Sequence, residues 1–352
     1  MANSQPDLPA TMHALQLVAY GPAQETLKYV ETKTPRISRP EDVLVQVKAI
    51  GVNPIETKLR SGNIWGVSLT LPAVIGSDFS GIVVERGEKV SALDVGDEVY
   101  GSIRLPFGLS GTYAEYVVVS TAQDAIAKKP DHMSFEEAAA AGIASLTAYE
   151  GLVKQGNLSA DHPAKLLVVG ASGGVGSYAI QMGKALGATV VGICSGKNAE
   201  FVSQLGAERV VNYQSPEAME QLVQEKDSYD VVLDCVGGES YFEKFSPLLR
   251  KSGIYSTAVG PVQHVGSEKL GFLDILKMGS KLSIRKLFGR YNYKIILSLT
   301  HKDFATKVNP FFANRLIRSV VLENNIIDLK DGAKAHELSE THRTVGKIVL
   351  RV

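Results

Sequence analysis

A glycine-rich turn is the clearest chemical signal in this sequence of 352 residues. The stretch Val168-Val-Gly-Ala-Ser-Gly-Gly-Val-Gly176 follows an apolar run and precedes a segment that favours a helix. Glycines let the backbone approach a pyrophosphate closely, and the free N–H groups and dipole of a helix N-terminus attract its negative charge. The turn therefore predicts a phosphate site, and the alternative is a helix-packing glycine cluster without a ligand. The predicted contacts are Ser172, Gly173, Gly174, Val175 and Gly176.

The end of the next predicted strand indicates which dinucleotide the turn would bind. An NAD site of this kind carries Asp or Glu about 20 residues on, to bind the ribose hydroxyl. Here that strand ends in Gly192-Ile-Cys-Ser195-Gly-Lys197, which contains no acid. A hydroxyl and an ammonium suit a 2′-phosphate instead, and Tyr213 after the third strand adds a phenolic donor. We therefore predict NADP(H), with Lys197 as an ordinary loop lysine as the alternative.

Strands and helices alternate around this turn. The predicted strands are 166–169, 189–193, 209–213, 230–234 and 254–258, and the predicted helices lie near 175–186, 198–205, 216–226 and 241–250. Strands rich in Val and Ile that are joined by helices predict a parallel sheet covered on both faces. Right-handed crossovers make that sheet doubly wound. A Ser134-Phe-Glu-Glu137 helix start precedes the region.

Residues 12 to about 130 are predicted to form short strands separated by turns. Val43, Val45 and Val47 alternate with less apolar residues, which is typical of a half-buried strand. Similar pieces follow at 81–85, 97–100 and 115–119, and the chain ends on a strand at 346–350 that could pair back onto this region. The pattern predicts a barrel-like β domain, so the fold class is α/β with two domains.

Composition argues against several classes of protein. Lys+Arg and Asp+Glu both number 37, so no basic excess favours nucleic-acid binding. The two cysteines, Cys194 and Cys235, cannot form a disulfide framework or a four-thiolate zinc site. The uncharged stretch 166–183 contains five glycines and is interpreted as strand, turn and helix start rather than a membrane span. Because the N-terminus lacks targeting features, we expect a cytoplasmic protein.

A basic segment at 277–294 has two interpretations. It carries leucines interleaved with Lys277, Lys281, Arg285, Lys286, Arg290 and Lys294. The first interpretation is a solvated helix face or a lid. The second is peripheral contact with an anionic membrane surface, which would suit a nucleotide-binding protein with little turnover.

Several stretches together carry a family resemblance: 51–58, 72–81, 95–97, 144–149, the glycine turn, 205–207 and 346–350. They resemble the medium-chain dehydrogenase/reductase superfamily, and within it the zinc-independent quinone oxidoreductase branch. The sequence is similar to chloroplast-envelope quinone-oxidoreductase homologues and to fungal members. The resemblance implies a GroES-like β-barrel domain at 1–133 and 310–352, a Rossmann NADP-binding domain at 134–309, and a homodimer as a common assembly.

The resemblance also bears on metal binding. Zinc-dependent relatives hold their metal with two cysteines and a His-Glu pair. The corresponding positions here are Asn53, Ser77 with Asp78, and Ile143. A single carboxylate without thiolate or imidazole partners cannot hold four-coordinate zinc, so we expect no zinc.

The implied activity is NADPH-dependent reduction of the C=C of an α,β-unsaturated carbonyl, or of a quinone. Such acceptors need no Lewis acid, whereas forming an alkoxide from an alcohol normally does. The resemblance places Thr147 against the nicotinamide and Asn53 at the substrate oxygen or ribose. It places Lys58 as a donor to an enolate or to ribose, with a surface lysine as the alternative. It further places Val236, Thr257 and Ala258 beside the nicotinamide and ribose, and Lys347 at a phosphate.

Overall fold

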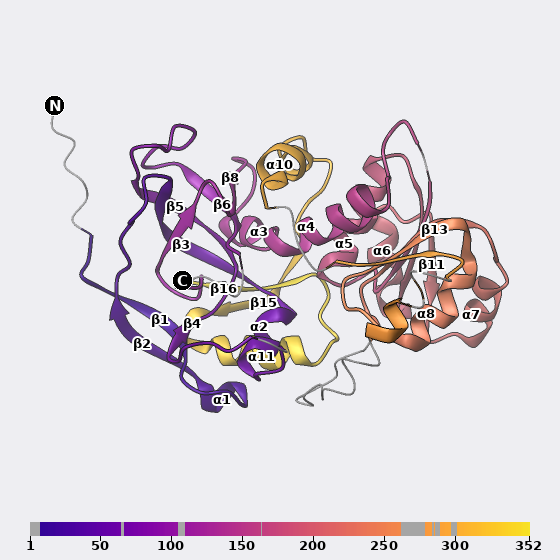
Figure 1. Ribbon diagram of the computed structural model, residues 1–352, viewed down its shortest axis with the longest axis horizontal. Helices are drawn as coiled ribbons and strands as arrows, with labels where there is room; N and C mark the ends of the chain where they lie inside the picture. The colour runs from indigo at the N-terminus through magenta and orange to yellow at the C-terminus, as the bar shows by residue number, and fades with distance from the viewer. Residues whose placement is uncertain are drawn as a thin grey trace. The chain divides into compact units, whose positions relative to one another are not determined.

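The structure is a computed structural model that describes residues 8–64, 67–104, 110–162, 164–261, 279–283, 285, 289–296 and 301–352. The chain forms two compact units (Figure 1). The first contains Met1–Ile143, Thr300–Ala313 and Ser319–Val352, and the second contains Ala144–Leu299 and Asn314–Arg318. Whether the predicted boundaries at 133/134 and 309/310 delimit domains that fold independently stays a prediction.

The main sheet of the first unit is organised around β3 (Asp42–Val52), which pairs with β5, β7 and β16. The strand order is β15-β16-β3-β5-β6-β8. The last strand pairs antiparallel with β3, with Ile348 opposite Val52, as the sequence predicts. The other strands of this sheet are β5 (Asp78–Arg86), β6 (Glu98–Ser102), β7 (Tyr116–Ser120), β8 (Ala125–Lys128), β15 (Val321–Asp328) and β16 (Lys347–Arg351).

A second, antiparallel sheet and short helices complete the first unit. The sheet has the order β2-β1-β4, from β1 (Thr11–Leu17), β2 (Leu27–Lys33) and β4 (Ala73–Val74). Helix α2 begins directly after Asn53 because Pro54 suits the first helical position. The helical segments are α1 (Ala23–Thr26), α2 (Pro54–Arg60), α3 (Phe135–Ala139), η4 (Phe304–Val308), α10 (Asn309–Ala313), η5 (Leu329–Asp331) and α11 (Gly332–Glu340).

Strand β3 follows the predicted half-buried pattern except at one position. Val43, Val45 and Val47 pack in the main core of the unit. On the opposite face, Gln46 and Lys48 are only partly buried, as the alternation predicts, whereas Leu44 is fully buried in a separate cluster with Met12.

The second unit is built on one parallel sheet with the order β11-β10-β9-β12-β13-β14. This order confirms the predicted doubly wound sheet, because the chain runs outward from β9 in one direction and then in the other. The strands are β9 (Lys165–Val169), β10 (Thr189–Cys194), β11 (Arg209–Asn212), β12 (Tyr229–Asp234), β13 (Leu249–Thr257) and β14 (Asn292–Ile295). The helical segments are α4 (Gly142–Tyr149, which begins in the first unit), η1 (Glu150–Gln155), α5 (Gly174–Ala185), η2 (Gly196–Asn198), α6 (Ala199–Gln204), α7 (Pro216–Val223), α8 (Glu239–Phe245) and η3 (Ser246–Leu248).

The sequence misplaces one boundary in this unit. The predicted helix near 241–250 ends earlier, because Pro247 cannot continue an α-helix. Leu249 instead opens β13 and pairs with Tyr229 of β12. The strand therefore begins five residues before the predicted 254.

Two further predictions concern local structure. Helix α3 begins as predicted, since the Ser134 hydroxyl accepts the N–H of Glu137 at 3.1 Å and the Glu137 carboxylate accepts the N–H of Ser134 at 2.9 Å. Both cysteines are free thiols.

In the described part of the chain, no helix combines the length and the apolar character needed to cross a bilayer.

Candidate functional site

One edge of the parallel sheet collects the predicted cofactor residues of the second unit. The glycine turn follows β9, Ser195 and Lys197 follow β10, and Tyr213 follows β11. On the other side of β9, Val236 follows β12, and the segment 257–258 lies at the end of β13. Open α/β sheets bind ligands outside the carboxyl ends of their strands, where the strand order reverses. The order reverses at β9 here, so this edge is the candidate nucleotide site.

The glycine turn has the geometry that close approach to a phosphate requires. Gly170 has a φ of +79°, and its N–H and that of Ala171 both donate to the carbonyl of Ile193, at 3.1 and 2.9 Å. A Cβ on Gly176 would lie 2.2 Å from the carbonyl oxygen of Gly170, so helix α5 can pack on the turn only with glycine at this position. The first N–H groups of α5 have no acceptor within the helix, which suits an anion.

The loops after β10 and β11 present polar groups beside this turn. Lys197 and Tyr213 are exposed, whereas Ser195 is buried. The amide Nδ2 of Asn198 donates to the hydroxyl of Ser172 at 3.1 Å, which ties the loop after β10 to the glycine turn. The sequence analysis missed Asn198. Its position directly after Lys197 in the same loop was the available signal.

Asp234 fixes the loop that carries Val236. One carboxylate oxygen accepts the N–H groups of Val236 and Gly237, both at 2.9 Å, and the other accepts the Tyr255 hydroxyl at 2.8 Å. Burial raises the pKa of Asp234, and these three donors oppose that effect. The sequence analysis missed this residue too. An acid that ends a buried strand three residues before the pair Gly237-Gly238 was the signal.

Thr257 fixes the neighbouring loop in the same way. Its hydroxyl oxygen accepts the N–H groups of Val259 and Gly260, at 3.2 and 3.0 Å. The N–H of Ala258 donates to the carbonyl of Asp234 at 3.0 Å, so the ends of β12 and β13 are joined. The backbone predicted to border the nicotinamide is thus held by hydrogen bonds within its own unit.

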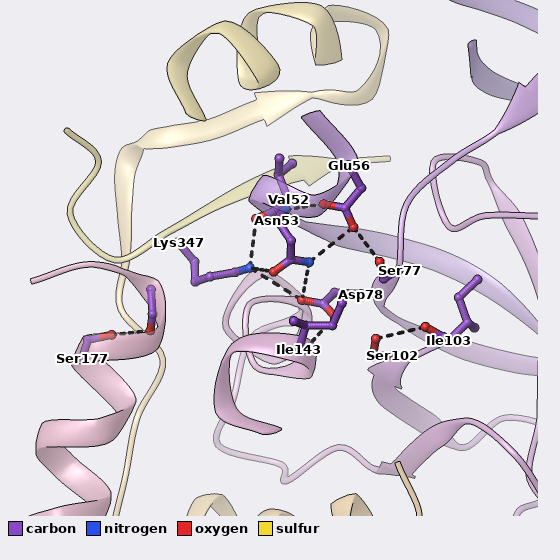
Figure 2. Close-up of polar contacts among 11 residues, drawn as sticks. Val52, Asn53, Glu56, Ser77, Asp78, Ser102, Ile103, Ile143, Ser177 and Lys347 are labelled. Carbon is purple, nitrogen blue, oxygen red and sulfur yellow. Dashed lines mark hydrogen bonds and ion pairs between the residues drawn. The ribbon is translucent and has the colours of Figure 1, made fainter. Parts of the chain in front are cut away.

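The first unit contains a buried polar cluster around Asn53 (Figure 2). The amide Nδ2 of Asn53 donates to a carboxylate oxygen of Asp78 at 3.0 Å, and its Oδ1 accepts from the ammonium of Lys347. That ammonium also donates to the carbonyl of Val52 at 2.9 Å and lies 3.6 Å from Asp78. The N–H of Ile143 donates to the other oxygen of Asp78 at 2.8 Å. Whether Lys347 also reaches a phosphate stays a prediction.

Glu56 adds a second buried carboxylate to this cluster. It accepts the N–H of Asn53 at 2.5 Å and the hydroxyl of Ser77 at 2.6 Å. The pKa of Glu56 is raised to about 7, first of all by burial; the nearby Asp78 adds to this effect, while the hydrogen bonds from Ser77 and Asn53 and the charge of Lys347 oppose it. Burial also raises the pKa of Asp78. The sequence analysis missed Glu56, although a glutamate three residues after an N-cap is a recognisable capping signal.

The positions that correspond to zinc ligands in relatives therefore meet in space, but their groups differ. They supply an amide, a hydroxyl, one carboxylate and a backbone N–H, and Lys347 contributes positive charge beside them. Among the residues that the structure describes, no three His, Cys, Asp or Glu side chains are grouped so that they could hold a metal ion. The expectation of no zinc stays a prediction.

The other two predicted catalytic residues belong to different units. Lys58 lies on α2 in the first unit and is half-buried, and burial lowers the pKa of its ammonium. Thr147 is buried on α4 in the second unit. Their catalytic roles, like that of Asn53, stay predictions.

The basic segment at 277–294 is in part engaged in ion pairs. Lys281 and Arg285 both pair with Glu239, the first residue of α8, and Arg290 pairs with Asp227. The Arg285 guanidinium also lies over the ring of Phe242, at 3.8 Å from its centroid. Lys277 and Lys286 lie outside the described residues. The paired cations are less available to a membrane surface than the sequence suggests.

The raised pKa of Glu56 predicts a specific pH dependence of stability. A carboxyl group whose pKa rises on folding stabilises the protein at low pH, and this stabilisation is lost as the pH rises through the folded pKa. A shift from 4.5 to about 7 corresponds to about 3 kcal/mol. The Glu56→Gln variant, which cannot ionise, should therefore gain about this much relative to the wild type between about pH 4.5 and pH 8.

Chemical denaturation of both proteins across this pH range measures the difference. Glu220→Gln is the matched control, because Glu220 is an exposed glutamate on helix α7. A constant difference in unfolding free energy between wild type and Glu56→Gln would contradict the assignment of a raised pKa to Glu56.

Comparisons with known proteins agree with this architecture. The family model for the alcohol dehydrogenase GroES-like domain matches residues 39–131, and the model for zinc-binding dehydrogenases matches residues 205–350. The chain is 34% identical over 246 residues to a chloroplast envelope quinone oxidoreductase homologue of Arabidopsis thaliana, covering 69% of this chain and 73% of that protein. It is 30% identical over 349 residues to the 2-methylene-furan-3-one reductase of Solanum lycopersicum, covering 97% and 80%.

Solved structures give the same result. The quinone oxidoreductase of Coxiella burnetii superposes with a TM-score of 0.80 at 30% identity, covering 97% of this chain and 99% of that one. The Escherichia coli quinone oxidoreductase complexed with NADPH superposes with a TM-score of 0.77 at 27% identity, covering 97% and 100%. These matches confirm a GroES-like β domain combined with a Rossmann-like sheet. The chain therefore belongs to the medium-chain dehydrogenase/reductase superfamily, as an oxidoreductase of its quinone oxidoreductase branch.

Proposed function

We propose that this protein uses NADPH, without a metal, to reduce the C=C of an α,β-unsaturated carbonyl or a quinone. The observation that carries the proposal is the edge of the parallel sheet, where an open glycine turn is followed by a hydroxyl, an ammonium and no acid. Relatives named quinone oxidoreductase and 2-methylene-furan-3-one reductase support the substrate class. The bound cofactor supplies the hydride.

The second unit would hold the cofactor. The N–H groups at the start of α5, together with Ser172, suit the pyrophosphate, and Gly176 gives the close packing that this contact needs. Ser195, Lys197 and Tyr213 would hold the 2′-phosphate, because an exposed ammonium attracts a dianion. The hydrogen-bonded loops after β12 and β13 would present a fixed surface to the nicotinamide and ribose, through Val236, Thr257 and Ala258.

Three residues are the candidates for the chemical step. Thr147 would pack against the nicotinamide, and Asn53 would be a neutral donor near the substrate oxygen or ribose. Lys58 would donate to the enolate oxygen that forms when hydride adds to the β-carbon. Its lowered pKa suits this role, because a half-buried ammonium loses its proton more readily than an exposed one. The α-carbon of the resulting enol would then take a proton from the solvent while the O–H proton returns to the Lys58 amine, so the acceptor gains one hydride and one proton in total.

The assay that tests the reaction measures NADPH consumption as the fall in absorbance at 340 nm, where the reduced nicotinamide absorbs. The acceptor panel should contain 2-alkenals, cyclic enones and naphthoquinones, alongside simple primary alcohols with NADP⁺. We expect turnover with members of the first group and none with the alcohols, and we expect both results to persist in a metal chelator. NADPH binding without turnover on any acceptor would contradict the proposal and favour a binding protein.

The cofactor preference is tested separately at Lys197. The Lys197→Asp variant should bind NADPH more weakly by roughly 1–3 kcal/mol, the range for a lost charge-assisted hydrogen bond, while NADH binding stays nearly unchanged. Titration of protein fluorescence with each nucleotide gives both dissociation constants. Lys226→Asp is the matched control, since Lys226 is an exposed lysine that follows a helix in the same unit. Equal weakening of both nucleotides would show that Lys197 does not recognise the 2′-phosphate.

A further inference from the structure

Three oxygen atoms converge on the ammonium of Lys347 at the start of β16. They are the carbonyl oxygen of Val52 at 2.9 Å, the Oδ1 of Asn53, and a carboxylate oxygen of Asp78 at 3.6 Å (Figure 2). The lysine side chain is only 5% exposed, and that of Asp78 is fully buried. A carbonyl, an amide oxygen and a carboxylate form a typical ligand set for a hard cation such as Mg²⁺, Mn²⁺ or Ca²⁺.

Charge balance explains why a cation is needed at this position. A buried carboxylate is stable only when it is paired or well hydrogen-bonded, and the cluster contains a second carboxylate, Glu56. The ammonium of Lys347 donates hydrogen bonds to Val52 and Asn53, and its charge lies at ion-pair distance from the carboxylate of Asp78. Asn53 connects the parts, because its Oδ1 faces the cation and its Nδ2 faces Asp78.

We propose that Lys347 is a resident cation: its ammonium fills a cation position formed by Val52, Asn53 and Asp78, and thereby closes that position to metal ions. Once the ammonium is removed, the three oxygens are available to a hard divalent cation, with water completing its coordination. The proposal goes beyond the reaction proposed above, since it rests only on contacts within the first unit and holds whichever acceptor the enzyme reduces.

The test is a gain of metal binding by removal of the lysine side chain. Full-length Lys347→Ala and wild type are titrated with MnCl₂, and free Mn²⁺ is measured by electron paramagnetic resonance. We expect the variant to bind one Mn²⁺ at least tenfold more tightly than the wild type and to gain thermal stability with Mn²⁺. Lys347→Ala combined with Asp78→Asn should lose this binding.

Lys128→Ala is the matched control. Lys128 also pairs with an aspartate of the same unit, Asp97 at 2.8 Å, but its side chain is 57% exposed, so water replaces it without creating a site. Lys347→Ala that binds Mn²⁺ no more tightly than Lys128→Ala would overturn the proposal, as would equally tight binding by the wild type. A tenfold rise in the NADPH dissociation constant without any change in Mn²⁺ binding would also overturn it, and would support the phosphate-binding role of Lys347.

A second comparison covers the case in which Lys347→Ala does not fold. The double variant Lys347→Met with Asp78→Asn removes both charges, whereas Lys347→Met alone leaves the carboxylate unpaired. The resident-cation proposal predicts a higher melting temperature for the double variant than for Lys347→Met. A double variant that melts at or below the temperature of the single variant would overturn the charge-balance argument.

Discussion

The close packing of helix α5 on the turn before it is the constraint on which the nucleotide unit depends. At Gly176 the helix comes so near to the carbonyl of Gly170 that no side chain fits. This packing directs the N-terminus of α5 toward the carboxyl edge of the sheet, where its N–H groups can bind an anion. The loops after β10, β12 and β13 end at the same edge, and the buried groups of Asp234 and Thr257 hold two of them in place. The unit is thus rigid where a cofactor would need a fixed surface.

The first unit buries two carboxylates in one polar cluster. Asp78 is paired with Lys347, while Glu56 is held by the hydroxyl of Ser77 and the N–H of Asn53. The chain matches the zinc-binding dehydrogenase model, but the groups that meet in this cluster are an amide, a hydroxyl, carboxylates and an ammonium. Hydride addition to an electron-poor double bond needs donors for a developing enolate rather than a Lewis acid for an alkoxide, so such a cluster is compatible with the proposed chemistry.

Local patterns in the sequence predicted much of the second unit. The strand β9, the glycine turn and helix α5 follow from apolar runs and glycine spacing, and the parallel sheet follows from their alternation. The helix before β13 ends earlier than the apolar pattern predicts, because Pro247 cannot continue an α-helix. The full burial of Leu44 on β3 could not be predicted, because the residues of its cluster, such as Met12 and Tyr116, are far away in the sequence.

The contact between Asn53 and Lys347 could not be predicted from the sequence either. Each residue is a candidate by itself, but their contact joins distant parts of the chain through the pairing of β16 with β3. Glu56 and Asp234 accept N–H groups from residues only two or three positions away, so their hydrogen bonds have local signals in the sequence. The full burial of both carboxyl groups, by contrast, depends on the fold around them.

The central claim is that hydride passes from NADPH to a carbon of the acceptor without a metal. Its most direct test uses NADPH that carries deuterium on both C4 positions of the nicotinamide. The deuterium is followed by NMR into the product of a cyclic enone, in the presence of a chelator. The account predicts one deuterium at the β-carbon and a solvent-derived proton at the α-carbon. Saturated product without deuterium at the β-carbon, or label transfer that appears only after metal is added, would contradict it.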